Sequence, residues 1–282
     1  MMKRILIAGT ALLAACGHIS SAEAPAAAAK AEVKSEGWYP SRYGPDDRLG
    51  AMNNLSPEKT AEAAKLITTG KTYALGQVTG RKTPAYGPRT FNMTVLQLSD
   101  GSGTPLGENK AVGNDDLVNT YVGIGSQLDG LGHMGIDHRY YNGVPVADFV
   151  TTGGLTQYGT HTLPPVATRG VLLDMTKAFG DPVPAGTAFN RAEIDAAAKA
   201  AGVTIGKGDI VLFHTGTMKA TEGSAELSPV ELGLGVEGAQ YLADLGVVAI
   251  GADTWALEVI PFEKETRPFD VHLTLLAKNG VY

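Results

Sequence analysis

The chain has 282 residues, with 23 Lys and Arg against 29 Asp and Glu, so its formal net charge is −6 when the six histidines are neutral. A hydrophobic content of 44% excludes a disordered chain, and the mildly acidic balance without basic runs excludes an electrostatic footprint for nucleic acid. A single cysteine excludes an intramolecular disulfide framework and a cysteine-cluster zinc site.

The N-terminus carries the pattern of an export signal. Lys3 and Arg4 precede an apolar run from Ile5 to Cys16, which is shorter than the ~20 residues that a membrane span requires. The run ends in the letters LAACG, which resemble a bacterial lipobox, where the cysteine is lipidated after cleavage and becomes the new N-terminus. We therefore expect a lipoprotein signal peptide over residues 1–15, lipidation of Cys16 and a disordered tether over residues 16–36.

This reading predicts an exported protein, either a periplasmic or an outer-membrane lipoprotein, that meets the membrane only through its N-terminal lipid anchor. The alternative is secretion after cleavage at Ala24, which ends an A-x-A site but is followed directly by Pro25. Residues 37–282 are expected to form one domain, because no linker divides them.

Helix signals begin with Ser56-Pro57-Glu58, which combines an N-cap residue, a proline at the first helical position and an acid in the first turn. This pattern predicts a helix over 56–67, before Gly70. A capping box over 190–193 opens an Ala-rich helix that ends at Gly202.

Strand and helix signals then alternate towards the end of the chain. Short apolar runs predict buried strands at 210–213 and 247–250, with a helix over 236–245 between them. A further helix is expected over 271–278, before Asn279-Gly280. This order predicts an α/β fold. Residues 90–150, rich in Gly, Asn and Asp, are expected to be a long loop that builds a site.

The densest polar segment runs from Gly123 to His133. In an extended stretch Gln127 and Asp129 point to the same side, and His133 follows after a glycine turn. Such donors can converge on a divalent cation. By spacing alone, however, a loop in which Gln and Asp bind their own backbone is favoured over a metal site.

The same segment resembles the signature HxGTHxDxPxH of the cyclase family of metal-dependent hydrolases, which includes bacterial kynurenine formamidase and isatin hydrolase. Gly125, Asp129 and His133 set the frame, whereas Gly123 and Gln127 stand where the family has its first two histidines. Ser126 replaces the family threonine and Leu131 the family proline. Further matching islands are YGPDD from position 43, YNG from 141, LPP from 163, TRGVLLD from 168, GADTWALE from 251 and VH from 271.

The resemblance implies one divalent metal ion, Zn or Mn, held by Gln127, Asp129 and His272, with His133 as general acid and base. A second metal site is not expected, because Gly123 offers no ligand and the corresponding glutamate of the family would lie beyond Tyr282. For the same reason we expect the domain to lack the C-terminal segment of the family.

Three further residues are candidates for contact with the substrate. Trp255 and Glu258 follow a predicted strand end, where ligands collect in α/β sheets, and Glu258 could alternatively orient His133. Tyr141, together with Tyr140, could form an aromatic wall for a planar substrate. For Asp253-Thr254, a turn that caps loop backbone is an equal alternative.

The fold implied by the resemblance is a single compact α/β domain with a mixed β-sheet or barrel-like core flanked by helices, assembled as a homodimer or homotetramer. The implied activity is hydrolysis of an amide bond, in an arylformamide or a cyclic amide, or of a lactone bond in a small aromatic substrate. Tryptophan catabolism through an arylformamidase is one setting for it. The alternatives are a lipoprotein of this fold that binds a ligand without turnover and a polyketide-type cyclase.

Overall fold

The computed structural model describes residues 37–97, 103–220, 223–224, 226–264 and 266–282. These residues all belong to one compact unit, which begins at Ser35. The expected signal peptide, lipidated Cys16 and tether lie outside the described residues. Within the described part, no helix is both long and apolar enough to cross a lipid bilayer.

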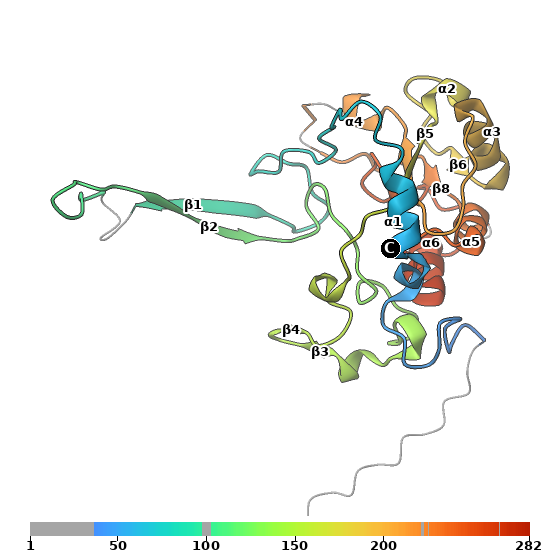
Figure 1. Cartoon of the computed structure of the whole chain (residues 1–282), viewed down its shortest axis with the longest axis horizontal. Coiled ribbons are helices and arrows are strands. Elements are labelled where there is room, and N and C mark those ends of the chain that lie inside the picture. Colours follow the sequence, from blue (N-terminus) through green and yellow to red (C-terminus); the bar gives the residue numbers. More distant parts are fainter. Residues whose placement is uncertain (1–36, 98–102, 221–222, 225, 265) are drawn as a thin grey trace, which may run out of the picture. The chain divides into compact units, whose positions relative to one another are not determined.

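The centre of the fold is a parallel sheet of three strands in the order β5-β7-β9 (Figure 1). The strands are β5 (Gly170–Asp174), β7 (Ile210–His214) and β9 (Ala249–Ala252). The α/β class is therefore confirmed. The described strands do not close into a barrel, and this sheet is purely parallel, so the antiparallel pairs lie elsewhere in the chain.

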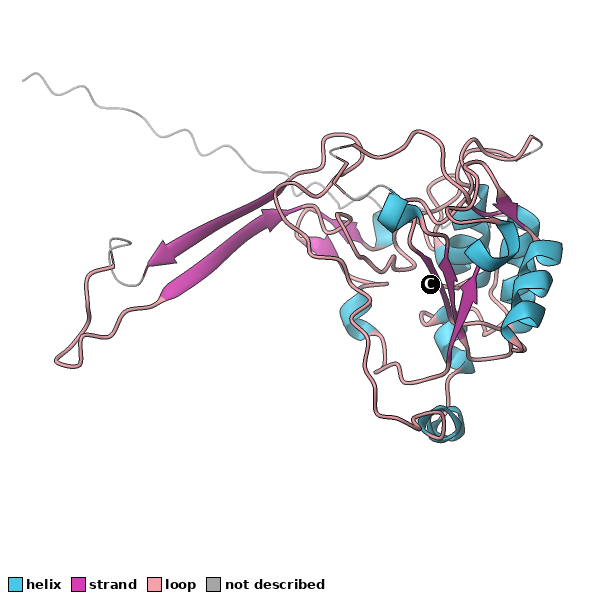
Figure 2. Ribbon diagram, turned by 90° about the horizontal axis from the view of Figure 1, so that it is seen from above, coloured by secondary structure: helices cyan, strands magenta, loops and turns pink. Residues whose placement is uncertain are grey.

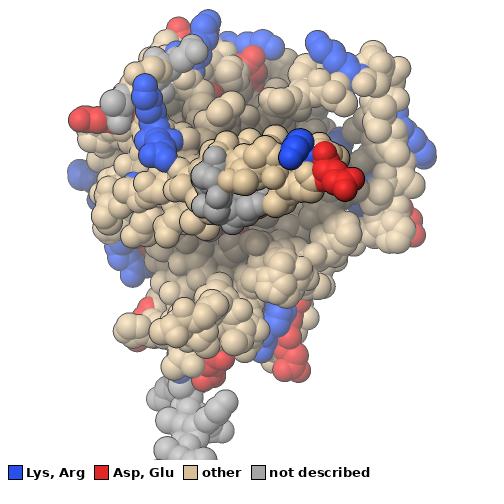
Figure 3. All heavy atoms as spheres, turned by 90° about the vertical axis from the view of Figure 1, so that its left-hand side faces the viewer, with Lys and Arg blue, Asp and Glu red and all other residues tan. Residues whose placement is uncertain are grey.

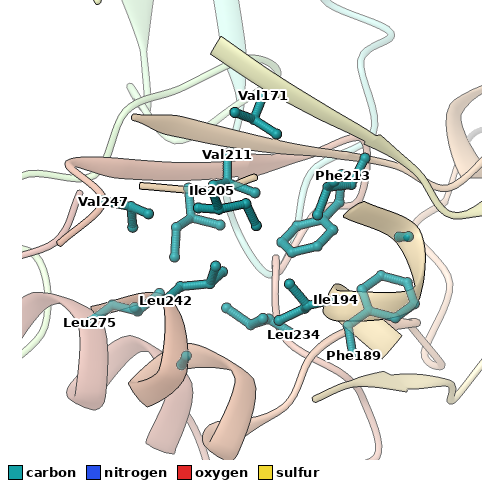
Figure 4. Packing of buried hydrophobic residues seen from close by; sticks show 14 of the residues in the cluster. Val171, Phe189, Ile194, Ile205, Val211, Phe213, Leu234, Leu242, Val247 and Leu275 are labelled. Atoms are coloured by element: carbon teal, nitrogen blue, oxygen red, sulfur yellow. The ribbon is translucent and has the colours of Figure 1, made fainter. Parts of the chain in front are cut away.

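Helices cover one face of this sheet and enclose the main core (Figure 4). The two longest covering helices are α3 (Arg191–Ala201) and α5 (Val236–Leu245). Apolar side chains from both layers interdigitate, and burying each of them stabilises the fold by roughly 1.5–3 kcal/mol. Ten of these core residues are labelled in Figure 4: Val171, Phe189, Ile194, Ile205, Val211, Phe213, Leu234, Leu242, Val247 and Leu275.

Shorter elements connect these layers. The remaining α-helices are α1 (Pro57–Ala64), α2 (Thr176–Phe179), α4 (Thr217–Ala220) and α6 (Asp270–His272), and α6 continues into the π-helical η5 (Leu273–Asn279). Single 3₁₀ turns are η1 (Gly50–Asn54), η2 (Tyr141–Gly143), η3 (Val146–Asp148) and η4 (Thr160–Thr162). Two-residue strands form an antiparallel pair, β3 (Val150–Thr151) with β4 (Gly154–Leu155), and a parallel pair, β6 (Ala188–Phe189) with β8 (Gly233–Leu234).

The helices predicted from capping signals are present. In α3, the side chain of Glu193 accepts a hydrogen bond from the backbone N–H of Asn190 at 3.0 Å, which is half of the predicted capping box. The helix α5 has the predicted bounds. The helix α1 ends at Ala64, three residues early, because its last turn tightens to bonds between residues three apart, such as Ile67 to Ala64.

A long antiparallel hairpin occupies part of the segment for which we expected a loop. Its strands are β1 (Phe91–Gln97) and β2 (Asn114–Thr120), and both views show it extending away from the parallel sheet (Figures 1 and 2). Every residue of β2 is exposed. The sequence pattern missed these strands because neither face of the hairpin is buried, so no alternation of apolar and polar residues marks them.

The face of the molecule that carries the hairpin has no continuous patch of either charge (Figure 3). Lys, Arg, Asp and Glu side chains are scattered over it, with both signs at several places.

Candidate active site

A cavity of about 480 Å³ lies against β9 and the loop that follows it. Its wall is formed by β9 and residues 253–257, by the polar segment 123–129, and by His272 of α6. These parts come from three distant regions of the sequence. The carboxyl end of a parallel strand is the common position of ligand sites in α/β folds.

Three side chains that can bind a metal ion converge at one end of the cavity. One ligand atom from each of Asp129, His133 and His272 lies within 4.8 Å of the others. The carboxylate oxygen Oδ2 of Asp129 lies 3.7 Å from Nε2 of His133 and 4.0 Å from Nε2 of His272. Burial lowers the pKa of His133, an effect that the charge of Asp129 opposes.

Glu258 holds His272 in place from behind. Its carboxylate is paired with Nδ1 of His272, so Nε2 is the ring nitrogen turned towards Asp129. Glu258 is only 1% exposed and does not line the cavity. We expected it to contact substrate or to orient His133; instead it orients His272, because β8 and the bridge between Leu234 and Glu258 place it beneath α6.

Gln127 lies beside this group, and its amide Nε2 donates to Oδ1 of Asp129 at 3.3 Å. Its Oε1 would lie 2.8 Å from a Cβ atom built on Gly123. The two departures from the family signature are therefore adjacent in space: the amide at position 127 occupies the room that a side chain at position 123 would need.

The donors present suit a divalent cation. Asp129 and His272 offer a carboxylate and an imidazole, and with Gln127 they make three protein ligands, the number typical of catalytic zinc sites; the oxygen of the Gln127 amide would be a harder donor that also suits Mn²⁺. Glu258 pairs with Nδ1 of His272. Histidines that bind a metal through one ring nitrogen usually pair with a carboxylate through the other. The structure thus brings together all four residues that were predicted for the metal site and its chemistry.

Substitution of Glu258 by glutamine is expected to weaken metal binding about 10–100-fold. The neutral amide is a weaker acceptor than the carboxylate for Nδ1–H of His272, so it holds the imidazole ring less firmly. The dissociation constant for Zn²⁺ or Mn²⁺, measured by competition with a chromogenic chelator, checks this. Glu237→Gln, on the surface of α5, is the control, and equal affinities in the two variants would contradict the role of Glu258.

The family model Cyclase, described as "Putative cyclase", matches residues 73–259, more than half of the chain. The chain belongs to the cyclase family. A search of the curated proteins finds no match.

Solved structures support this cyclase fold. A crystal structure described as a novel cyclase is 27% identical, with a TM-score of 0.73, and the match covers 85% of this chain and 81% of that chain. Isatin hydrolase A from Labrenzia aggregata, bound to benzyl benzoate, is 14% identical with a TM-score of 0.52 over 78% of this chain and 82% of its own. An isatin hydrolase bound to the product analogue thioisatinate is 19% identical with a TM-score of 0.52, over 80% and 84% of the two chains.

An aromatic wall borders the cavity of this cyclase-family chain, with a different composition from the one expected. Trp255 lines the cavity as predicted, and its indole stacks on the ring of Tyr86 with centroids 5.1 Å apart and planes 8° apart. The indole N–H donates to the backbone carbonyl of Ser228 at 3.1 Å, which fixes the ring. Tyr86 was missed because it lies in an irregular Pro- and Gly-containing segment without a recognisable motif.

Tyr141 does not take part in this wall, contrary to our expectation. Its side chain is fully buried in the core, where its hydroxyl donates to Asp47 at 2.6 Å. Its backbone carbonyl accepts a hydrogen bond from Tyr158 at 2.7 Å. The matching YNG island therefore has a structural role, which joins the N-terminal segment of the domain to the core beneath η5.

A buried acidic residue that is not part of the candidate metal site also lines the cavity. Glu231 is 3% exposed, and its Oε2 has no hydrogen-bond partner among the described residues. Burial raises the pKa of Glu231 to about 7; the backbone N–H of Trp255 opposes this rise and the charge of Asp253 adds to it. Sequence reasoning missed Glu231 because no motif surrounds it.

This raised pKa predicts a pH-dependent loss of stability. The folded protein holds the proton of Glu231 more tightly than the unfolded chain, whose glutamates titrate near ~4.3, so stability falls as the pH rises from there to about 7 and then levels off. Compared with Glu231→Gln, the wild type should lose Tm between pH 5 and pH 8, as measured by calorimetry. Asp253 and its partner His214 are common to both proteins, so their titration cancels in the difference. Parallel Tm profiles would contradict the prediction.

Proposed function

We propose that this chain is a metal-dependent hydrolase that opens an amide or lactone bond in a small aromatic molecule. The observation that carries the proposal is the convergence of Asp129, His133 and His272, with Gln127 beside them, at the end of a cavity in a chain of the cyclase family. Isatin hydrolases among the structural neighbours share the fold and support the class of reaction.

The residues divide the chemistry between them. Asp129, His272 and Gln127 would hold a divalent ion, which would supply the Lewis acidity that polarises a carbonyl and acidifies water. His133, with Nε2 facing the same carboxylate, takes the proton from the attacking water and delivers it to the leaving nitrogen or oxygen. Glu258 pairs with Nδ1 of His272 and so directs Nε2 at the site.

The cavity supports a planar aromatic substrate. The stacked pair of Tyr86 and Trp255 presents a flat π surface along its wall, and aromatic rings favour offset stacking on such a surface. Arylformamides, cyclic amides of the isatin type and aryl lactones all combine a flat ring with a carbonyl to be attacked. Arylformamide cleavage would connect the enzyme with tryptophan catabolism.

The test is a substrate panel with matched metal loading. The full chain, stripped with a chelator and reloaded with Zn²⁺ or Mn²⁺, is assayed on N-formylaniline, isatin and dihydrocoumarin. Metal-dependent hydrolysis of at least one, lost in Asp129→Asn, supports the proposal. A metal-loaded protein with no activity beyond that of Asp129→Asn would instead favour a ligand-binding protein of the same fold.

We also propose that the protein is exported and anchored through a lipid on Cys16. The support is the LAACG sequence after a short apolar run. Radiolabelled palmitate should enter the wild type and fail to enter Cys16→Ser, whereas equal incorporation would contradict the anchor. Secretion of an unlipidated chain that starts after Ala24 is the competing result.

The chain is further proposed to assemble as a homodimer or homotetramer through the hairpin of β1 and β2. An isolated two-stranded hairpin is marginally stable in water, and this one exposes Val95, Leu96, Leu117 and Val118. The double variant Val95→Asp/Leu117→Asp should shift the protein to a monomer in size-exclusion chromatography with light scattering. Glu108→Lys, in the connection between the strands, is the control. An unchanged mass in the double variant would contradict this role of the hairpin.

A further inference from the structure

The cavity has a polar end that the metal site does not use. Glu231 and Thr254 both line it, and their buried oxygens Oε2 and Oγ1 make no hydrogen bond of normal geometry with any described residue, although the hydroxyl of Thr254 is close enough to the carboxyl of Glu231 to lower its pKa. Most buried polar atoms in folded proteins have a partner, so two neighbouring exceptions in the wall of a cavity indicate a ligand group or an ordered water.

The backbone around Glu231 is rigid, so its carboxyl has a defined position. Glu231 exchanges backbone hydrogen bonds with Ile260, at 2.8 and 2.9 Å, and its carbonyl also accepts from Gly186 at 3.2 Å. Trp255, whose indole is fixed by Ser228, follows Thr254 directly. The two orphan oxygens therefore lie next to the aromatic wall on a preorganised surface.

The charges at this end select the kind of group that can bind. The acids Glu231 and Asp253 are neighbours, and Asp253 is already satisfied by the backbone N–H and hydroxyl of Thr215, both at 2.8 Å or less, and by His214 at 3.2 Å. A substrate carboxylate would meet the negative charge of Asp253 here. An amino or hydroxyl group would instead donate to the unpartnered oxygens.

We propose that Glu231 and Thr254 form a specificity subsite that accepts a hydrogen bond from an amino or hydroxyl substituent on the aromatic ring of the substrate. The proposal rests on the proposed function for the identity of the aromatic ligand. It assigns these residues to recognition of the ring substituent, while Asp129, His133 and His272 act on the carbonyl.

The test measures binding rather than turnover. Isothermal titration of the full chain compares benzamide, 3-aminobenzamide and 3-carboxybenzamide. Because the amino group donates a hydrogen bond to the carboxyl of Glu231, the amino compound should bind at least about tenfold more tightly than benzamide, and the carboxy compound more weakly.

Three variants locate the effect. Glu231→Leu replaces the buried carboxyl by an apolar group of similar size, removes the acceptor of the Trp255 backbone N–H, and should reduce the preference for the amino compound to about one. Thr254→Val should reduce it in part. Glu226→Gln removes an exposed carboxylate that lines the same cavity and should retain the full preference.

An amino compound that binds no better than benzamide, or a preference that survives in Glu231→Leu, would overturn the subsite and assign a bound water to these oxygens. The outcome is independent of hydrolysis. If the protein discriminates the three ligands but hydrolyses nothing, the subsite is supported and the hydrolase proposal is contradicted. If it hydrolyses a substrate but does not discriminate the ligands, the hydrolase proposal is supported and the subsite is contradicted.

Discussion

Replacing His133 with alanine is expected to lower kcat by about 10²–10⁴-fold while the metal content stays close to that of the wild type. The geometry separates His133 from the ligand His272. His272 is 14% exposed in its side chain and pairs with Glu258 through its second nitrogen, the arrangement that orients a metal ligand. His133 is 40% exposed, and its second nitrogen has no such carboxylate partner among the described residues.

The measurement combines steady-state kinetics with elemental analysis of the same samples. His272→Ala is the matched comparison, and it should lose both metal and activity. If His133→Ala loses metal to the same extent as His272→Ala, then His133 is the third ligand of the ion rather than the acid and base. Retained metal together with unchanged kcat would exclude both roles.

Replacing Arg169 with methionine is expected to reduce the free energy of unfolding by about 3 kcal/mol. Asp209 is fully buried, and Arg169 contacts both of its carboxylate oxygens at the start of β5 and β7. The remaining bond from the backbone N–H of Gly206, at 2.8 Å, cannot neutralise the buried charge. Urea unfolding should show a lower midpoint with an unchanged slope.

The control is the exposed pair of Arg191 and Asp195, whose side chains are 62% and 52% exposed. Arg191→Met should change stability by less than about 1 kcal/mol, because exposed ion pairs contribute little. The double variant Arg169→Met/Asp209→Leu should recover much of the loss, since it leaves no unpaired charge. A single variant at Arg169 that is as stable as the wild type would contradict the argument.

Local signals in the sequence were sufficient to predict the helices, in which the backbone satisfies its own hydrogen bonds. The capping residues of α3 and the glycine after α5 lie within a few residues of the groups that they serve, so the bounds followed from adjacent letters. The hairpin of β1 and β2 could not be predicted in this way, because β2 is exposed throughout and β1 is only half-buried at Phe91 and Met93.

The candidate site likewise contains residues that could be predicted from local motifs and residues whose roles depend on tertiary packing. Gln127, Asp129 and His133 share one motif, so the resemblance located them together, and it also supplied His272 from a distant island. The role of Glu258 depended on the pairing of its segment with Leu234, which places the carboxylate behind His272. Tyr141 could not be distinguished from a substrate contact by its residue type, because its burial against Asp47 arises only from packing.

The family, the chemistry of the donors and the capped helices could be inferred from residue identities at short spacing. The three-dimensional packing was needed to show which of two aromatic candidates faces the cavity, which histidine has a carboxylate behind it, and that Glu231 and Thr254 place buried oxygens in the cavity wall. Burial and pairing are relations between segments far apart in the chain, so no local pattern of residues can specify them.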